Sequence, residues 1–176
     1  MRNLAFIFLC LILPFNVFAF DDSENAVDRN FYQMGLGAGN FNLGGSWASA
    51  PIITIGKRFE LEDCAIELST SWGEHDFNNG SKLKYYAFPR LMFLKFHDNE
   101  ASSSFFYGGG LSWSGLRKNE EKFDGIFVEG RLGYEFKRNA RLSPNVHLDV
   151  IQPLVAHQHT GSHPGPSVLL GMSVGF

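Results

Sequence analysis

The chain has 176 residues, of which 44% are hydrophobic and 15% aromatic, and its formal net charge at pH 7 is −3. This length fits a single domain. The absence of a basic stripe or a Lys/Arg run argues against a nucleic-acid-binding surface.

The first 19 residues have the three parts of an export signal. Arg2 supplies a positive start, residues 4–15 form an apolar core, and small residues stand at the expected cleavage position. A membrane-spanning helix would need about 20 apolar residues, and this stretch is shorter. We therefore predict a cleaved signal peptide over 1–19 and a short periplasmic segment over 20–30. Cleavage leaves Cys64 as the single cysteine, so no intramolecular disulfide can form.

Beyond residue 30, apolar and polar residues alternate with a period of two, and there is almost no helical periodicity. Such alternation is typical of β-strands that have one apolar face and one polar face. Eight segments show the pattern: 31–40, 50–60, 64–73, 83–95, 104–114, 125–136, 143–153 and 167–176.

The gaps between these segments alternate in length. The gaps near 60–63 and 137–142 are short and charged, and that near 96–103 is intermediate. Longer gaps rich in Gly, Asn, Asp or His lie near 41–49, 74–82, 115–124 and 154–166. Transmembrane barrels have short periplasmic turns, long outer loops and strands of about 9–11 residues. We therefore predict an all-β fold, an eight-stranded antiparallel up-and-down transmembrane β-barrel over 31–176, with four outer loops.

The polar face of the predicted strands carries repeated glycines and charges of both signs. Glycines suit a crowded lumen, and eight strands leave an interior that side chains just fill. We therefore assign the apolar face to lipid, rather than to the inside as in a soluble barrel. An unpaired buried charge is very costly, so we expect a structural network of paired charges and no ion or proton pathway. Its predicted members are Arg58, Glu67, Lys84, Arg90, Glu129, Arg131, Glu135 and Asp149.

Aromatic residues on the apolar face are candidates for the girdles at the two membrane interfaces. They are Tyr32, Trp72, Tyr85, Trp113, Tyr134 and Phe176. In this assignment Tyr85 faces lipid together with Leu83 and Ala87. Pro89 lies in the middle of the same strand, where it removes a ladder donor, so we expect a bulge or kink there.

The last strand places Val168, Leu170, Met172, Val174 and Phe176 on one face. A chain that ends on Phe in such a pattern resembles the assembly signal of bacterial outer-membrane barrels, here the small eight-stranded barrels of OmpA/OmpX-like architecture. The resemblance implies a location in the bacterial outer membrane and recognition of Phe176 by the barrel assembly machinery. It also implies contact with outer-membrane lipid and lipopolysaccharide.

The last predicted outer loop, 156–166, contains three of the six histidines. One interpretation is a solvated surface loop. A second is a metal site, because His157 and His159 point to one side of an extended chain and imidazoles bind zinc, copper or nickel. No second ligand cluster accompanies them, so we predict no metal and no cofactor. The third interpretation is nucleophilic catalysis.

The third interpretation is based on residues 84–96, residues 105–114, and the His-containing loop before the final strand, which together resemble the lipid A 3-O-deacylase family. The resemblance implies a Ser nucleophile two residues after a His, with a Glu on the final strand that orients the imidazole. If the family His is His157, then His159 stands where that Ser belongs, and if it is His159, then Gly161 stands there. Thr160 and Ser162 are the hydroxyls that could substitute in a rearranged geometry. No acidic residue follows Asp149, which favours a role without catalysis.

We accordingly predict an outer-membrane barrel with a structural or surface-interaction role, carried by four outer loops that can meet an extracellular partner. The alternative is a lipid A deacylase-like acyl-ester hydrolase. Its candidate catalytic residues are His157, His159, Thr160 and Ser162.

Overall fold

The computed structural model describes residues 30–61, 64–78, 80–98, 103–119, 121–137, 142–158 and 164–176, without the side chains of 156–158. The predicted signal peptide and almost all of the predicted periplasmic segment lie outside these ranges. None of the described residues forms a helix long and apolar enough to cross a membrane.

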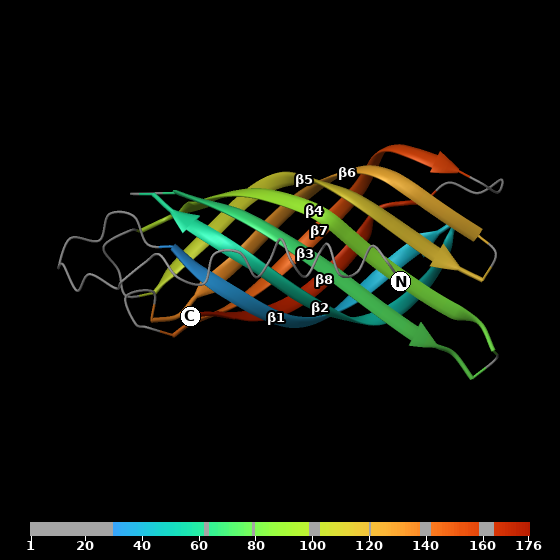
Figure 1. Cartoon of the computed structure of the whole chain (residues 1–176), viewed down its shortest axis with the longest axis horizontal. Coiled ribbons are helices and arrows are strands. Elements are labelled where there is room, and N and C mark those ends of the chain that lie inside the picture. The colour runs from blue at the N-terminus through green and yellow to red at the C-terminus, as the bar shows by residue number, and fades with distance from the viewer. Residues whose placement is uncertain are drawn as a thin grey trace, which may run out of the picture.

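Eight antiparallel strands form one closed barrel, in which each strand pairs with its sequence neighbours and β1 pairs with β8 (Figure 1). This confirms the predicted fold class and strand number. The strands are β1 (Asn30–Leu43), β2 (Ser46–Glu60), β3 (Cys64–Asp76), β4 (Lys82–Phe96), β5 (Ser104–Lys118), β6 (Glu121–Glu135), β7 (Ser143–Gln158) and β8 (Ser167–Gly175).

The barrel has two distinct ends (Figure 1). The loop end, on the right in the figure, carries the β1–β2, β3–β4, β5–β6 and β7–β8 connections. The terminal end, on the left, holds the start of β1 and the C-terminal Phe176.

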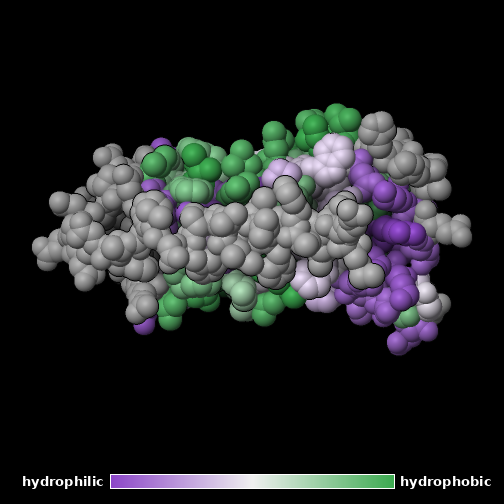
Figure 2. Space-filling model, in the orientation of Figure 1, coloured by the Kyte–Doolittle hydropathy of each residue, from purple (hydrophilic) through white to green (hydrophobic). Residues whose placement is uncertain are grey.

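Outward-facing side chains form an apolar belt around the barrel wall. Large hydrophobic residues there are exposed, among them Leu36 at 61%, Leu132 at 59% and Leu170 at 63%. Such a surface is far larger than the apolar patches that a water-soluble monomer tolerates. Figure 2 shows this belt over the body of the barrel, with polar surface concentrated at the loop end.

The strands are longer than predicted. The prediction missed their loop-end parts because the polarity of the inner and outer faces is reversed there. Inward-facing Phe41 and Leu43 are buried there, whereas outward-facing Asn40 and Ser49 are exposed. The predicted long loop 41–49 is therefore wrong. Gly44 and Gly45, both with positive φ, make a two-residue hairpin turn between β1 and β2.

The same extension shortens the predicted loops 74–82 and 115–124 to the turns between β3 and β4 and between β5 and β6. The first and last residues of both predicted loops belong to strands that extend beyond the apolar belt.

Strand β4 contains the bulge expected at Pro89. Ala87 pairs with Ser114 and Arg90 pairs with Ser112, so β4 has one more residue than β5 over this stretch. Because of the extra residue, each residue of β4 before the bulge lies on the opposite face of the sheet from the one predicted. Tyr85 is therefore buried inside the barrel at 2% exposure and is not a girdle aromatic. The predicted lumen position of Lys84 is also wrong, since this side chain lies on the outer wall.

The barrel closes where the last strand meets the first. Beyond the regular β1–β8 ladder, the backbone N–H of Phe176 donates to the carbonyl of Tyr32 at 2.8 Å, and the N–H of Tyr32 donates back at 3.1 Å. Phe176 therefore holds the terminal end of the seam, with its ring half exposed on the outer wall.

Candidate functional site: the filled lumen and the loop-end wall

Charged side chains fill part of the lumen and join both neighbouring strands and strands that are not neighbours. Arg131 of β6 donates to both carboxylate oxygens of Asp149, at 2.7 and 3.1 Å, and to both oxygens of Glu67 on β3 at 3.0 Å. Arg90 of β4 donates through Nε to Glu129 at 2.5 Å, and it also contacts Asp149. All five side chains are at most 5% exposed.

A second part of the network lies toward the terminal end. Arg58 of β2 donates to Glu135 of β6 at 2.6 Å and lies 3.6 Å from Glu67, which links it to Arg131. The structure thus brings together seven of the eight predicted network residues and leaves out only Lys84. The prediction missed Glu60, 3.8 Å from Arg58, at the boundary between the second predicted strand segment and the gap that follows it.

Apolar cores fill the lumen around these charges. The loop-end core contains Phe41, Leu43, Ile52, Leu83, Tyr85, Ala87, Leu116, Phe123, Phe127, Ile151 and Leu169 among its buried residues. The terminal-end core consists of Ala65, Met92, Leu94, Phe96 and Phe106. On β4, Arg90 stands between Ala87 of the first core and Met92 of the second. The described lumen is therefore filled by side chains from end to end.

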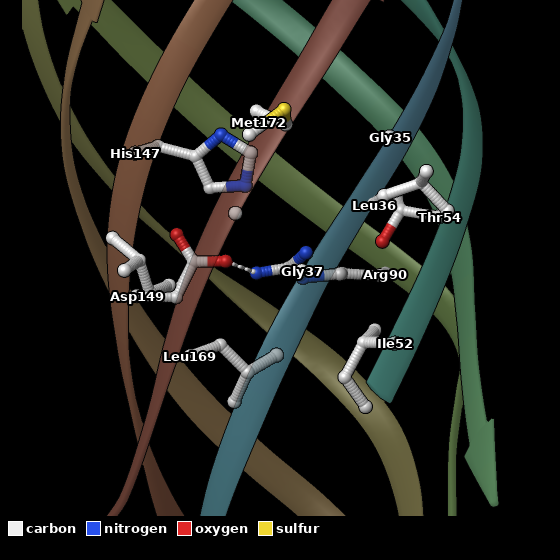
Figure 3. Close-up of a pocket in the computed structure, with 12 residues that line it drawn as sticks. Gly35, Leu36, Gly37, Ile52, Thr54, Arg90, His147, Asp149, Leu169 and Met172 are labelled. Carbon is white, nitrogen blue, oxygen red and sulfur yellow. Dashed lines mark hydrogen bonds and ion pairs between the residues drawn. The ribbon is translucent and has the colours of Figure 1, made fainter. Parts of the chain in front are cut away.

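One small cavity lies against the β1–β8 seam. Glycines on both strands, Gly35 and Gly171 among them, leave it open beside Arg90, His147 and Asp149. Figure 3 shows Arg90 reaching Asp149 across the lumen, with His147 two residues along β7. The cavity has room for about one water molecule, so it is too small for an organic substrate.

The loop-end wall is the outward face of the strands beyond the apolar belt. Its most charged part lies on β3 to β6, where direct cross-strand partners form the row Glu74, Lys84, Arg117 and Lys122. Lys84 pairs with Glu74 at 2.7 Å, and Lys122 pairs with Asp124 at 2.8 Å.

An aromatic row lies next to the charged row, on the side toward the belt. Trp72 of β3 is opposite Tyr86 of β4. The next position, on β5, is Gly115, where a side chain would collide with the Tyr86 ring. Tyr86 therefore lies across this glycine, and its hydroxyl contacts the Asp124 carboxylate on β6. This arrangement went unpredicted because it depends on the bulge, which places Lys84 and Tyr86 on the outer wall.

The candidate catalytic and metal-binding residues of the last loop remain predictions. His159, Thr160 and Ser162 lie outside the described residues, and only the backbone of His157 is described, opposite Asp124 of β6. Elsewhere in the described ranges, no group of three or more His, Cys, Asp or Glu side chains is arranged to hold a metal ion. Cys64 is a free cysteine.

Five of the six predicted girdle aromatics lie on the outer wall. Trp72 and Trp113 are 57% and 45% exposed on the part of the wall nearer the loop end. Near the terminal end, Tyr134 packs edge-on against Phe105 and Phe136, at centroid distances of 4.7 and 4.8 Å. The exception is Tyr85, as described above.

Solved structures of known proteins share this architecture. Neisserial surface protein A (NspA) aligns with a TM-score of 0.71 over 83% of this chain and 95% of its own, at 10% sequence identity. Ail, the attachment invasion locus protein of Yersinia pestis, solved in complex with the heparin analogue sucrose octasulfate, aligns with a TM-score of 0.53 at 10% identity, covering 85% and 99% of the two chains. The outer-membrane protein OprG of Pseudomonas aeruginosa aligns with a TM-score of 0.50 at 11% identity, covering 85% and 97%.

No protein-family profile matches the sequence, and no curated protein matches it. The structure and these similarities define the class: the chain has the fold of the small eight-stranded β-barrels of bacterial outer membranes.

Proposed function

We propose that this protein is a bacterial outer-membrane barrel with a structural or surface-interaction role, and that its working part is the loop-end wall. The observation that carries the proposal is the filled lumen. Two apolar cores and a network of paired charges occupy the described interior, where a pore would need a continuous aqueous path.

The polarity reversal on the wall supports the same role. Strands that only span a membrane need about 9–11 residues, whereas seven of these have 13 to 16. The additional length forms a rigid, polar wall beyond the belt, and side chains on paired strands are held more firmly than side chains on loops.

Two of the similar structures are consistent with this role. NspA is by name a surface protein, and Ail was solved with a polyanionic heparin analogue. We carry over only the general role of a surface barrel, because the sequence identities of 10% support the fold alone.

Cysteine labelling on intact cells tests the proposed orientation. Trp47→Cys lies at the loop end and Lys137→Cys at the terminal end, each made in a Cys64→Ser background. A membrane-impermeant maleimide is expected to label Trp47→Cys and to leave Lys137→Cys unlabelled until the cells are opened. The reverse pattern would overturn the proposal.

Conductance in planar bilayers tests the absence of a pore. The purified barrel is expected to leave the bilayers electrically silent. Steady conductance steps would contradict a filled lumen and reopen the ion-pathway interpretation.

A further inference from the structure

We propose that the loop-end wall binds the phosphate groups of the outer-leaflet glycolipid, lipid A, through the row Lys84, Arg117 and Lys122. This inference deepens the function proposed above and depends on the orientation stated there. It starts from the pairing of the strands, which places three cations directly opposite one another on β4, β5 and β6.

Like charges at directly opposite positions destabilise a sheet, because their Cβ atoms are only about 5 Å apart. The row therefore needs negative charge close by. Among the described residues, the ion pairs of the row are those of its two outer members, Lys84 with Glu74 and Lys122 with Asp124.

Arg117, in the middle of the row, is exposed and donates through Nε to the backbone carbonyl of Asn119 at 3.4 Å. The row has three cations and two carboxylate ion-pair partners, so it has one net positive charge, which we assign to Arg117. A guanidinium binds phosphate oxygens with two parallel hydrogen bonds, which a lysine ammonium cannot do.

The two flanking lysines are able to join such a contact. The Lys84–Glu74 pair is 50% and 43% exposed, and Lys122 is 48% exposed. Ion pairs in which both partners are this exposed contribute little to stability, so the Lys84 ammonium can turn toward a bound phosphate at small cost. Lys122 is itself exposed, but its partner Asp124 is only 14% exposed, so we expect Lys122 to reach a phosphate while it keeps this ion pair.

The position of the row favours a lipid headgroup over a soluble anion. Trp72 and Tyr86 form the adjacent row on the belt side, and exposed Trp and Tyr rings mark the membrane interface in barrels of this class. Lys84 is two residues farther along β4, about 7 Å beyond Tyr86. Phosphate-bearing headgroups lie in this layer, immediately outside the hydrocarbon region.

The test measures lipid A binding to the purified chain in a non-ionic detergent by native mass spectrometry. The parent is compared with a triple variant, Lys84→Gln, Arg117→Gln and Lys122→Gln. A matched control, Lys57→Gln, Lys95→Gln and Lys137→Gln, removes the same charge near the terminal end. Heat-dependent gel mobility verifies that each variant is folded.

We expect the triple variant to bind bisphosphorylated lipid A at least tenfold more weakly than the parent, and the control to bind within twofold of it. Lipid A without its phosphates is expected to bind parent and triple variant equally weakly. Equal binding of bisphosphorylated lipid A by parent and triple variant would overturn the inference, as would an equal loss in the control.

Inorganic phosphate serves as the competing probe. Displacement of lipid A by phosphate at equimolar concentration would show a free-anion site and overturn the assignment to a lipid. Because the assay uses purified protein, its failure is distinguishable from failure of the cysteine labelling, which tests orientation alone.

Discussion

Replacing Arg131 with methionine tests whether the lumen charges hold the barrel together. Arg131 donates to two carboxylates, Asp149 and Glu67, and both are buried. After the replacement, Asp149 keeps its contact with Arg90, whereas Glu67 keeps a 3.6 Å approach to Arg58 and hydrogen bonds from Ser69, at 3.4 Å, and from Gln33. A buried charge that has lost its main partner typically destabilises by about 3–5 kcal/mol.

We therefore expect Arg131→Met to lower the free energy of unfolding by about 3–5 kcal/mol, more than a hundredfold in the unfolding equilibrium constant. Glu74→Gln is the matched control, because the Glu74–Lys84 pair, at 2.7 Å, is as short as the Arg131–Asp149 pair but about half exposed. Exposed pairs are typically worth about 0–1 kcal/mol. The two variants thus differ mainly in burial.

The assay is reversible urea unfolding of the barrel refolded into phospholipid vesicles, followed by tryptophan fluorescence and by gel mobility. A second variant, Arg131→Met with Glu67→Gln, removes the stranded charge and is expected to recover part of the loss. If Arg131→Met and Glu74→Gln shift the unfolding free energy by the same small amount, the lumen network does not stabilise the barrel and the reasoning is refuted.

Four further predictions concern backbone packing, the bulge, the C-terminus and catalysis. Gly108→Ala is expected to destabilise by about 1–3 kcal/mol, because its Cβ would meet the Phe93 carbonyl, whereas Gly130→Ala, with open space around it, should be neutral in the same unfolding assay. Deleting Pro89 is expected to leave a folded, heat-modifiable barrel, since β4 then matches its neighbours residue for residue. Deleting Leu111 from the regular strand β5 is expected to abolish folding. If the Leu111 deletion folded and the Pro89 deletion did not, the bulge would be contradicted. Deleting Phe176 removes the hydrogen-bonded pair with Tyr32 and is expected to lower the amount of assembled barrel in cells, measured by gel mobility of outer-membrane fractions; unchanged assembly would argue against a terminal signal. Mass spectrometry of lipid A from cells with and without the protein is expected to show the same acyl chains, and loss of one acyl chain would support the hydrolase alternative.

The period-two pattern predicted the fold because, in the belt, the outward face meets an apolar surrounding and the inward face holds polar groups. Residues such as Leu68 and Glu67 follow this rule and were assigned to the correct faces. The same rule fails at the loop end. There the outside is polar and the inside apolar, so Phe41 and Asn42 have the reverse pattern, and this part of the strand was mistaken for a loop.

The faces of β4 depend on a single extra residue. Pro89 indicated an irregularity, but a proline signals a bulge without stating how many residues it inserts. The consequence for Lys84 and Tyr85 follows only from pairing with β3 and β5. The charged row on the loop-end wall was for the same reason beyond prediction, because it requires the register of three neighbouring strands.

The lumen charges also bear on the order of folding events. Two of the ion pairs, Arg131–Asp149 and Arg58–Glu67, join the strands of one hairpin. Other pairs join residues distant in sequence: Arg58 and Glu135 are 77 residues apart, Arg131 and Glu67 are 64 apart, and Arg90 and Asp149 are 59 apart. None of these three long-range contacts exists within one hairpin, so a partly formed sheet that enters lipid would carry some charges on its inner face without their long-range partners. Such an intermediate is strongly disfavoured in a bilayer. The sheet is therefore expected to curl and pair its charges at the membrane surface before it inserts, which makes insertion a single late step and not a strand-by-strand process.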